Sequence, residues 1–338
     1  MRTTDPAVPP RRTEAGRVRL LVALVAVVAL AGAAGLLVWL GAGPLPDPEG
    51  CTAEVDGTEV ELTTDQSENA ALIAALAVRR GLPARAVSIA LATAFQESKL
   101  RNIDYGDRDS VGLFQQRPSQ GWGAREQLMD PVYATNAFYD ELVEVDGYQD
   151  MRITEAAQAV QRSGFPEAYE EHAEGARVLA SALTGWSEAR FSCVVAEPSG
   201  EAEAEGASGL TPRAERVRER ITEVFGDLPV GGFAPGGVDS GHMEGSAHYD
   251  GRAVDVFFRP VDDANQRRGW ALASYLVAHA ADLEVDHVIF DGRIWSSGRR
   301  SEEGWREYSP SSAEGADPTT RAVLLHRDHV HVDVVEGD

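Results

Sequence analysis

The chain has 338 residues and an excess of acidic side chains, 54 Asp and Glu against 31 Lys and Arg, which gives a formal net charge of −23. This balance excludes a general nucleic-acid binder, because phosphate recognition requires basic patches. Hydrophobic residues make up 43% and charged residues 25%, as in folded globular domains, and only two cysteines are present, which excludes a disulfide-dense scaffold. The length is sufficient for about two domains.

An uncharged run without proline, Leu20–Leu40, follows a short basic N-terminal segment. At about 1.5 Å per residue, a helix of this length crosses a hydrocarbon core of roughly 30 Å. Arginines outnumber acidic residues in residues 1–19, which predicts a cytoplasmic N-terminus. We therefore expect a cytoplasmic tail at 1–19, a single transmembrane signal anchor at 20–40 and extracytoplasmic domains beyond it at the cell membrane. A cleaved signal peptide is the alternative.

Cys51 and Cys193 are the two cysteines, and they bracket the segment that follows the apolar run. Disulfides persist outside the membrane. We therefore expect these residues to form a bridge that closes a domain at 51–193 and removes entropy from its unfolded chain. Two unpaired thiols are the alternative.

Two helices are predicted in the first part of this domain. Ser67 is a good N-cap for the first, Gly81 ends it, and Pro83 begins the second, which is largely apolar. Glu97 falls in the last turn of the second helix. The negative end of the helix dipole and partial desolvation both raise the pKa of a carboxyl group there, and a raised pKa suits a general acid. From the helix alone, a solvated glutamate is the simpler interpretation.

A second motif follows Glu97-Ser98. Residues 110–115 read Ser-Val-Gly-Leu-Phe-Gln, and Gln120-Gly121-Trp122 follows. This pair of motifs resembles the lysozyme-like fold of lytic transglycosylases and goose-type lysozymes, and the longer string is similar to an actinobacterial cell-wall branch of that group. The resemblance covers about residues 58–190 and implies an all-α domain.

By this resemblance, Glu97 is the general acid/base that acts on the glycosidic oxygen between amino sugars. Ser98 and Gln115 would orient the substrate or the carboxylate. Tyr105 and Trp122 would stack on sugar faces, with core packing as the alternative for each aromatic ring.

Two points of this resemblance stay open. The usual Ala-Tyr-Asn motif is absent, and Gln161 is the nearest replacement for its Asn. Hydrolases commonly use a second carboxylate, for which Asp104, Asp107 and Asp109 are candidates, whereas a single-glutamate lyase relies on the acetamido group of the substrate. We favour the single glutamate and leave the choice between lyase and hydrolase open.

Residues 194–211 form an acidic linker. Within it, Ala196–Gly209 carries four Glu, no basic residue and no large apolar residue. Such a segment cannot bury a core, so we expect an extended tether between two folded units.

The third part of the chain concentrates histidine, and its patterns predict two strands that carry polar side chains. The alternation in His329–Val334 places His329, His331 and Asp333 on one face. Ala253–Phe258 reads as a second strand, which carries Asp255. Two imidazoles and a carboxylate are a typical catalytic zinc set that leaves a fourth position for water. Further elements are expected as a helix at Asn265–Leu283 and a strand at Val285–Phe290.

The motifs Ser246-x-His248, Gly251-x-Ala253-x-Asp255 and His329-x-His331 resemble those of LAS metallopeptidases, which include D-Ala-D-Ala carboxypeptidases and murein endopeptidases. The resemblance covers about residues 212–335 and implies an α+β domain with a small antiparallel sheet at 212–338. It implies one zinc ion, bound by His248, Asp255 and His331. His329 would assist the transition state. His326 would lie next to the metal ligands and help to orient them.

Several neighbouring residues do not fit this pattern. His242 is a competing ligand but lacks an Asp at the right spacing, and His279 and His287 are assigned to structure. No Lys or Arg lies between Arg220 and Arg252, where relatives carry an Arg that holds a peptide carboxylate. Recognition of a peptide carboxylate is therefore in doubt.

The expected fold class is an N-terminal transmembrane helix, an all-α lysozyme-like domain and an α+β LAS-like domain. The expected function is membrane-anchored peptidoglycan remodelling, with glycan cleavage by the Glu97 domain and zinc-dependent cleavage of peptide stems by the C-terminal domain. The expected partners are peptidoglycan and the cytoplasmic membrane, with no nucleic acid. A catalytically weakened cell-wall-binding or scaffolding protein and an extracytoplasmic metal-binding protein are the alternatives.

Overall fold

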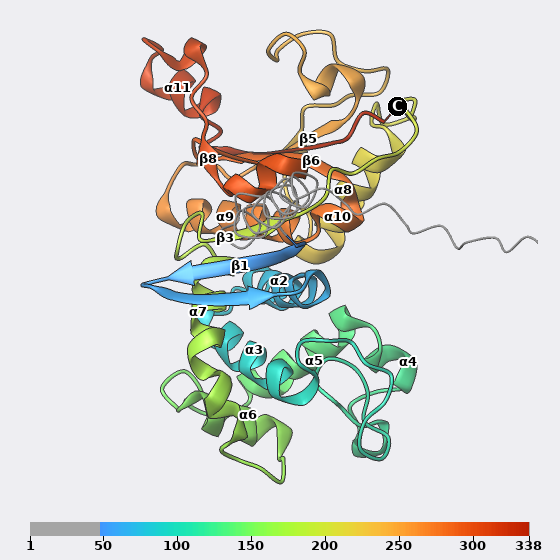
Figure 1. The fold of residues 1–338 in the computed structure, drawn as a ribbon, viewed down its shortest axis with the longest axis vertical. Coiled ribbons are helices and arrows are strands. Elements are labelled where there is room, and N and C mark those ends of the chain that lie inside the picture. The colour runs from blue at the N-terminus through green and yellow to red at the C-terminus, as the bar shows by residue number, and fades with distance from the viewer. Residues whose placement is uncertain (1–47, 338) are drawn as a thin grey trace, which may run out of the picture. The chain divides into compact units, whose positions relative to one another are not determined.

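The computed structural model describes residues 48–337, and Glu49–Asp338 form one compact unit. The predicted transmembrane segment Leu20–Leu40 lies outside the described residues. Within residues 48–337, no helix is both long enough and apolar enough to cross a bilayer. We call residues 49–193 the N-terminal part and residues 212–337 the C-terminal part (Figure 1).

The N-terminal part is not all-α, so the predicted fold class is wrong: the described chain is mixed α/β with antiparallel sheets. A three-stranded antiparallel sheet has the order β2-β1-β3. Asp56 and Gly57 connect β1 to β2 with φ of 52° and 80°. Positive φ at both residues is typical of a two-residue hairpin turn, so this Asp-Gly pair was the overlooked signal for the hairpin. The strands are β1 (Gly50–Val55), β2 (Thr58–Leu62) and β3 (Phe191–Val194).

Six α-helices and two short 3-10 helices complete the N-terminal part as the structure describes it. Their bounds are α2 (Thr64–Arg79), α3 (Ala84–Ser98), η1 (Pro118–Gln120), α4 (Arg125–Leu128), α5 (Pro131–Val143), α6 (Ile153–Gln161), η2 (Ala168–His172) and α7 (Ala173–Leu183). Ser67 is not an N-cap but lies buried inside α2, where its hydroxyl donates to the Thr64 carbonyl. Thr63 caps α2 instead, because Gln66 accepts a hydrogen bond from its backbone N–H.

A disulfide joins Cys51 and Cys193. These residues face each other across β1 and β3, the first and last strands of the N-terminal part. The bridge therefore closes a segment of 142 residues at the sheet.

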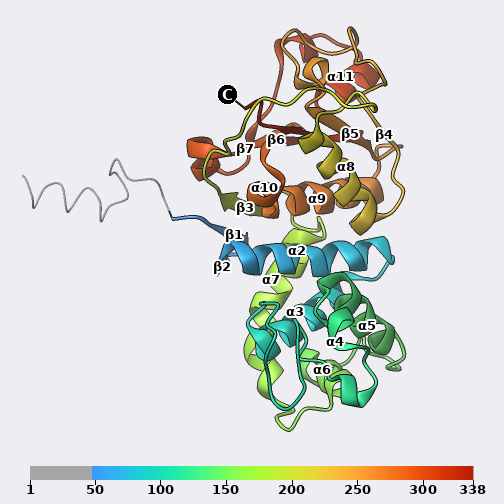
Figure 2. The same cartoon turned by 90° about the vertical axis from the view of Figure 1, so that its right-hand side faces the viewer.

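The C-terminal part is built on a six-stranded antiparallel sheet of order β4-β5-β9-β6-β7-β8. Helices α8 and α9 cover one face, while α11 and the loops that precede η3 rise over the other (Figures 1 and 2). The strands are β4 (Val230–Gly231), β5 (Ala253–Phe257), β6 (Val285–Phe290), β7 (Arg293–Ser296), β8 (Arg306–Glu307) and β9 (His329–Val334). The helices are α8 (Pro212–Phe225), η3 (Ala247–Asp250), α9 (Asp263–Ala278), α10 (Ala280–Leu283), η4 (Gly298–Glu303), η5 (Ser311–Ala313) and α11 (Pro318–Leu324).

One buried core runs through both parts, with α2 packed on α9. Two tryptophans of the C-terminal part reach the small sheet: the indole N–H of Trp295 donates to the Cys193 carbonyl, and that of Trp305 donates to the Phe191 carbonyl. The acidic segment between the parts has neither helix nor strand from Ala196 to Glu205, and Glu203 accepts from the backbone N–H of Arg213.

Candidate functional site

Three side chains from three elements meet on the open face of the large sheet. Asp255 of β5 is paired in register with His331 of β9, so their side chains stand next to each other on one face. His248 comes from the short helix η3, whose N-cap residue Ser246 accepts from the His248 backbone N–H. The opposite face of β9 presents Val330 and Val332 to the core, so the strand that carries the polar cluster is anchored by buried side chains.

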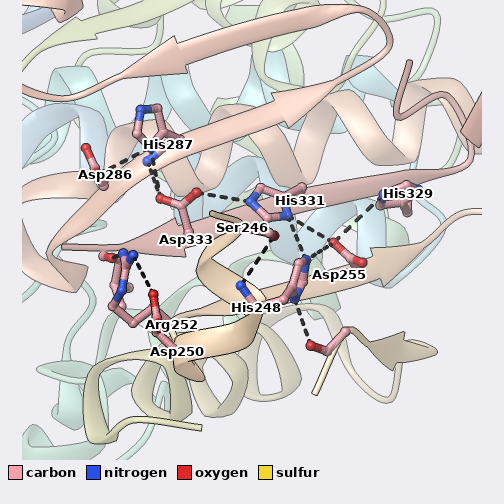
Figure 3. Close-up of polar contacts among 12 residues, drawn as sticks. Ser246, His248, Asp250, Arg252, Asp255, Asp286, His287, His329, His331 and Asp333 are labelled. Atoms are coloured by element: carbon pink, nitrogen blue, oxygen red, sulfur yellow. Dashed lines mark hydrogen bonds and ion pairs between the residues drawn. The ribbon is translucent and has the colours of Figure 1, made fainter. Parts of the chain in front are cut away.

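The facing atoms of this trio are almost equidistant (Figure 3). His248 Nε2 lies 3.1 Å from His331 Nδ1 and 3.2 Å from Asp255 Oδ1, and His331 Nδ1 lies 3.1 Å from Asp255 Oδ1. Ligand atoms about 2.0 Å from a tetrahedral metal are separated from one another by about 3.3 Å. The spacing of the trio therefore fits three positions of one tetrahedral metal.

The imidazoles of the trio are fixed by bonds on their far sides. His248 Nδ1 lies 2.8 Å from the Gly232 carbonyl, and His331 Nε2 lies 3.0 Å from Asp333 Oδ2. Such partners set the tautomer that leaves the other ring nitrogen free for a metal. Gly232 is required here: a Cβ on it would lie 2.2 Å from His248 Cε1, and its φ is +82°.

Asp333 also forms contacts on the side that faces away from the trio. Its Oδ1 accepts from the backbone N–H of His287 and lies 3.0 Å from His287 Nδ1, while Asp286 lies 3.3 Å from the same nitrogen. Asp333 thus links the imidazole of His331 to that of His287 (Figure 3). The sequence predicted only a structural role for His287. Its spacing along the chain gave no sign of the contact with Asp333.

The electrostatics of the cluster favour a positive charge at its centre. Burial opposes a charged imidazole at His331, but hydrogen bonds to Asp255 and Asp333 outweigh burial and raise its pKa to about 10. Burial disfavours the charge on Asp255, yet the contacts with His248 and His331 hold its pKa well below the usual range. The carboxylates of Asp255 and Asp333 therefore favour a positive charge next to them, as they would favour a metal cation.

His329 and His326 stand beside the trio. His329 Nε2 lies 3.8 Å from Asp255 Oδ1, and its Nδ1 lies 2.8 Å from Asp328 Oδ1. Asp328 in turn accepts from Arg259 at 2.7 Å. The ring of His326 is 4.5 Å from that of His329, and burial lowers the pKa of His326 to about 3, so it is neutral at pH 7.

A cleft of about 460 Å³ opens over these residues. His242 and Met243 line one side of it, and Val323 of α11 lines the other. Arg252 and Arg259 also line the cleft, so two guanidinium groups lie where the sequence upstream of Ser246 provides none. Two groups of side chains here could hold a metal ion, namely His242–His248–Asp255 and Asp286–His287–Asp333. The prediction of a metal-binding His/Asp centre is confirmed at this level.

The second candidate site lies at the end of α3 in the N-terminal part. Glu97 is partly buried, and its Oε1 accepts a 2.7 Å hydrogen bond from the Tyr169 hydroxyl of η2. Burial raises the pKa of Glu97, and hydrogen bonds from Tyr169 and Gln161 counteract it in part. Both partners are neutral, so Glu97 stands as a lone carboxyl group among uncharged donors. Gln161, the predicted replacement for the missing Asn, lies beside it.

The other predicted residues of this site hold its loops or face solvent. The Ser98 hydroxyl is buried and donates to the Leu113 carbonyl, and the Gln115 amide donates to the carbonyls of Tyr105 and Gly112. The Tyr105 side chain is 70% exposed. Trp122 lines a second hollow together with Gln161.

One candidate for a second carboxylate has another task. The Arg117 guanidinium and the Ser119 N–H and hydroxyl hold the pKa of Asp109 well below its usual range. Asp109 therefore fastens the loop that carries the motif after Glu97.

Asp333 was predicted to share a strand face with His331 but was given no role, and Gly232 and Asp328 were not predicted as functional residues. Asp333 had a signal, because it lies two residues after His331 on the same face of a strand. Asp328 had a weaker signal as the neighbour of His329. Gly232 had none, because its role depends on β4 lying next to β5.

One family model, described as VldE, C-terminal domain, matches residues 206–319. The match includes His248 and Asp255 and ends before His329 and His331. A search of curated proteins finds no match to the chain. The C-terminal part of the chain is therefore similar to the C-terminal domain of VldE over about a third of the sequence.

Proposed function

We propose that this chain is a peptidoglycan-remodelling enzyme whose C-terminal part binds one zinc ion on His248, Asp255 and His331 and cleaves peptide stems. The observation that carries the proposal is the 3.1–3.2 Å spacing of the three facing atoms. Two imidazoles and one carboxylate leave a fourth position of a tetrahedral zinc for water or substrate. When bound, zinc would supply polarisation of a carbonyl and acidification of a water molecule.

His329 is the residue of the cleft best placed to move a proton. Asp328 holds its Nδ1, which leaves Nε2 directed towards Asp255. A histidine fixed in this way by a carboxylate can accept or donate a proton at Nε2 or stabilise a developing negative charge. Arg259 lines the cleft and its side chain is 55% exposed beside its ion pair with Asp328, so it is suited to a carboxylate of the peptide. The Arg252 guanidinium, in contrast, is held by Asp250 and the Val334 carbonyl.

For the N-terminal part, we propose that Glu97 is the general acid/base for cleavage of the glycan strand. Its raised pKa supports this role, because an acid must keep its proton until the leaving oxygen takes it. Its neutral neighbours support the single-glutamate interpretation, in which the acetamido group of the substrate assists. The disulfide supports an extracytoplasmic site of action.

The test uses the purified full chain, incubated with peptidoglycan before and after zinc removal by a chelator, with the products identified by mass spectrometry. Peptide cleavage is expected to stop on chelation, to return with zinc, and to be absent from His331→Ala. Glycan cleavage is expected to be unaffected by chelation, and anhydro ends would identify a lyase. Peptide products that persist in the chelated chain and in His331→Ala would contradict the zinc peptidase.

One observation favours a second function, metal binding without hydrolysis. His242 lies close enough to His248 and Asp255 to be counted with them as a metal group. A site closed by four protein ligands is typical of structural rather than catalytic zinc. Zinc binding without any peptide product in the same experiment would support this alternative.

A further inference from the structure

His242 lies over the metal-binding trio but comes from a separate segment. Residues 232–246, between β4 and η3, have neither helix nor strand. From this segment the imidazole of His242 stacks on that of His248, with ring centroids 3.9 Å apart and an interplanar angle of 23°. The chain thus brings a third imidazole to the centre.

A specific tether holds the backbone of His242 in this place. The Tyr249 hydroxyl accepts from the His242 N–H at 3.1 Å and donates to the His242 carbonyl at 2.7 Å. Tyr249 follows His248 directly in η3. The same short helix therefore positions both a ligand of the trio and the residue that stacks on it.

The distances allow His242 to reach a shared metal. One ligand atom each from His242, His248 and Asp255 lie within 4.8 Å of one another. Ligand atoms of a tetrahedral zinc lie about 3.3 Å apart, so an approach of about 1.5 Å or less would bring His242 to that spacing from His248 and Asp255. His248 already directs Nε2 towards Asp255 and His331, so only the ring of His242 would have to turn a nitrogen towards the metal.

The segment around His242 has room to move. Gly241 and Gly245 flank it with φ of +97° and +76°, and a Cβ on either would meet nothing within 4 Å. Glycines in open space absorb backbone changes at little cost. The Tyr249 hydroxyl is the contact that such a movement would break.

We propose that His242 is a fourth, displaceable ligand that closes the metal centre until substrate enters the cleft. This inference rests on the zinc site of the proposed function. His242 and the trio His248, Asp255 and His331 would together hold the ion through three imidazoles and one carboxylate and would keep water from it. Movement of the segment would withdraw His242 and leave the trio in place, accessible to water or substrate. His242 therefore regulates the site and is not part of the permanent ligand set.

The experiment loads the full chain with one equivalent of zinc and counts imidazole ligands by X-ray absorption, with affinity from competition against a chromogenic chelator. The variants are His242→Gln, Tyr249→Phe and the control His172→Gln, which replaces a histidine of the N-terminal part. Wild type and His172→Gln are expected to show three imidazoles, and His242→Gln two. The affinity is expected to fall roughly 10–100-fold in His242→Gln, by analogy with loss of a supporting partner, and less in Tyr249→Phe.

The outcomes separate this inference from the proposed function. Two imidazoles in both wild type and His242→Gln would overturn the fourth ligand and leave the zinc site of the trio intact. A wild-type chain that binds no zinc would overturn both. Three imidazoles falling to two, with peptide cleavage at saturating zinc faster in His242→Gln than in wild type, would support a displaceable ligand. Three falling to two with slower cleavage would contradict displacement.

Discussion

The partners of Glu97 are the neutral side chains of Tyr169 and Gln161, whereas the partners of His331 are the carboxylates of Asp255 and Asp333. At Glu97, burial without a balancing charge raises the pKa and keeps a proton on an acid. At His331, carboxylates on both sides raise the pKa of a base and create a place for a cation. A raised pKa is therefore consistent with proton donation by Glu97 in one part and with cation binding next to His331 in the other.

The two sites also differ in how they are built. Glu97 lies on one helix and takes its hydrogen bonds from η2 and α6, whereas the candidate metal centre gathers its side chains from η3, β5 and β9. A centre made from several elements depends on supporting contacts behind each ligand.

Glu97→Gln is expected to lower glycan cleavage by roughly 10²–10⁴-fold, because Gln accepts the Tyr169 hydrogen bond but cannot donate a proton as an acid. Release of peptide products should stay at the wild-type rate. Both rates can be followed by mass spectrometry of digested peptidoglycan. The matched control is Glu54→Gln, which replaces an exposed carboxylate of β1. Equal loss of glycan cleavage in the two variants would contradict the role of Glu97 as the acid.

Asp333→Asn is expected to weaken zinc binding by about 10–100-fold without removing a ligand, because the carboxylate that orients His331 is lost. The affinity can be measured by competition with a chromogenic chelator. Asp146→Asn, an exposed carboxylate of the N-terminal part, is the control. An unchanged affinity in Asp333→Asn would show that the network behind His331 is not needed.

Gly232→Ala and Gly57→Ala form a matched pair. Their φ values are +82° and +80°, so each alanine costs about 1–2 kcal/mol of stability from the backbone conformation. Only at Gly232 would the new Cβ also meet an imidazole, that of His248 at 2.2 Å, whereas at Gly57 it meets nothing within 4 Å. Zinc affinity is expected to fall in Gly232→Ala and to stay unchanged in Gly57→Ala. A similar affinity in the two variants would argue against a tightly supported His248.

The smallest effect is on stability. The folded-state pKa of Glu97 is raised above the ordinary 4.5 by burial, so its contribution to folding is full below pH 4.5 and is lost as the pH rises through the folded-state pKa. Glutamine is uncharged at every pH, so Glu97→Gln removes this loss of stability at high pH. The variant is expected to have a higher Tm than wild type at pH 7, and the difference should vanish below pH 4.5. A lower Tm at pH 7 would indicate that the ionised carboxylate is stabilised rather than strained.

Much of each site was predictable from local patterns. The alternation in His329–Val334 correctly predicted β9, with His329, His331 and Asp333 on one face, because side chains of a strand alternate with a period of two. The position of Glu97 at the end of α3 followed from the apolar run and from Pro83, which precedes the helix. The all-α prediction failed because β1 and β2 are short, and their apolar–polar alternation around the Asp56-Gly57 turn was overlooked. The pairing of β3 with β1 joins the two far ends of the N-terminal part, so no local pattern indicates it.

Local patterns are sufficient to predict which polar residues share a strand face or a helix turn, because those positions depend only on the local backbone period. The other contacts of the two sites depend on tertiary packing. Antiparallel pairing of β5 with β9 put Asp255 opposite His331, and the pairing of β4 with β5 brought the Gly232 carbonyl to His248. The fold also brought Tyr169 to Glu97 across 72 residues of chain. These contacts join segments far apart in sequence, so they are set by the packing of the whole core and not by any local pattern.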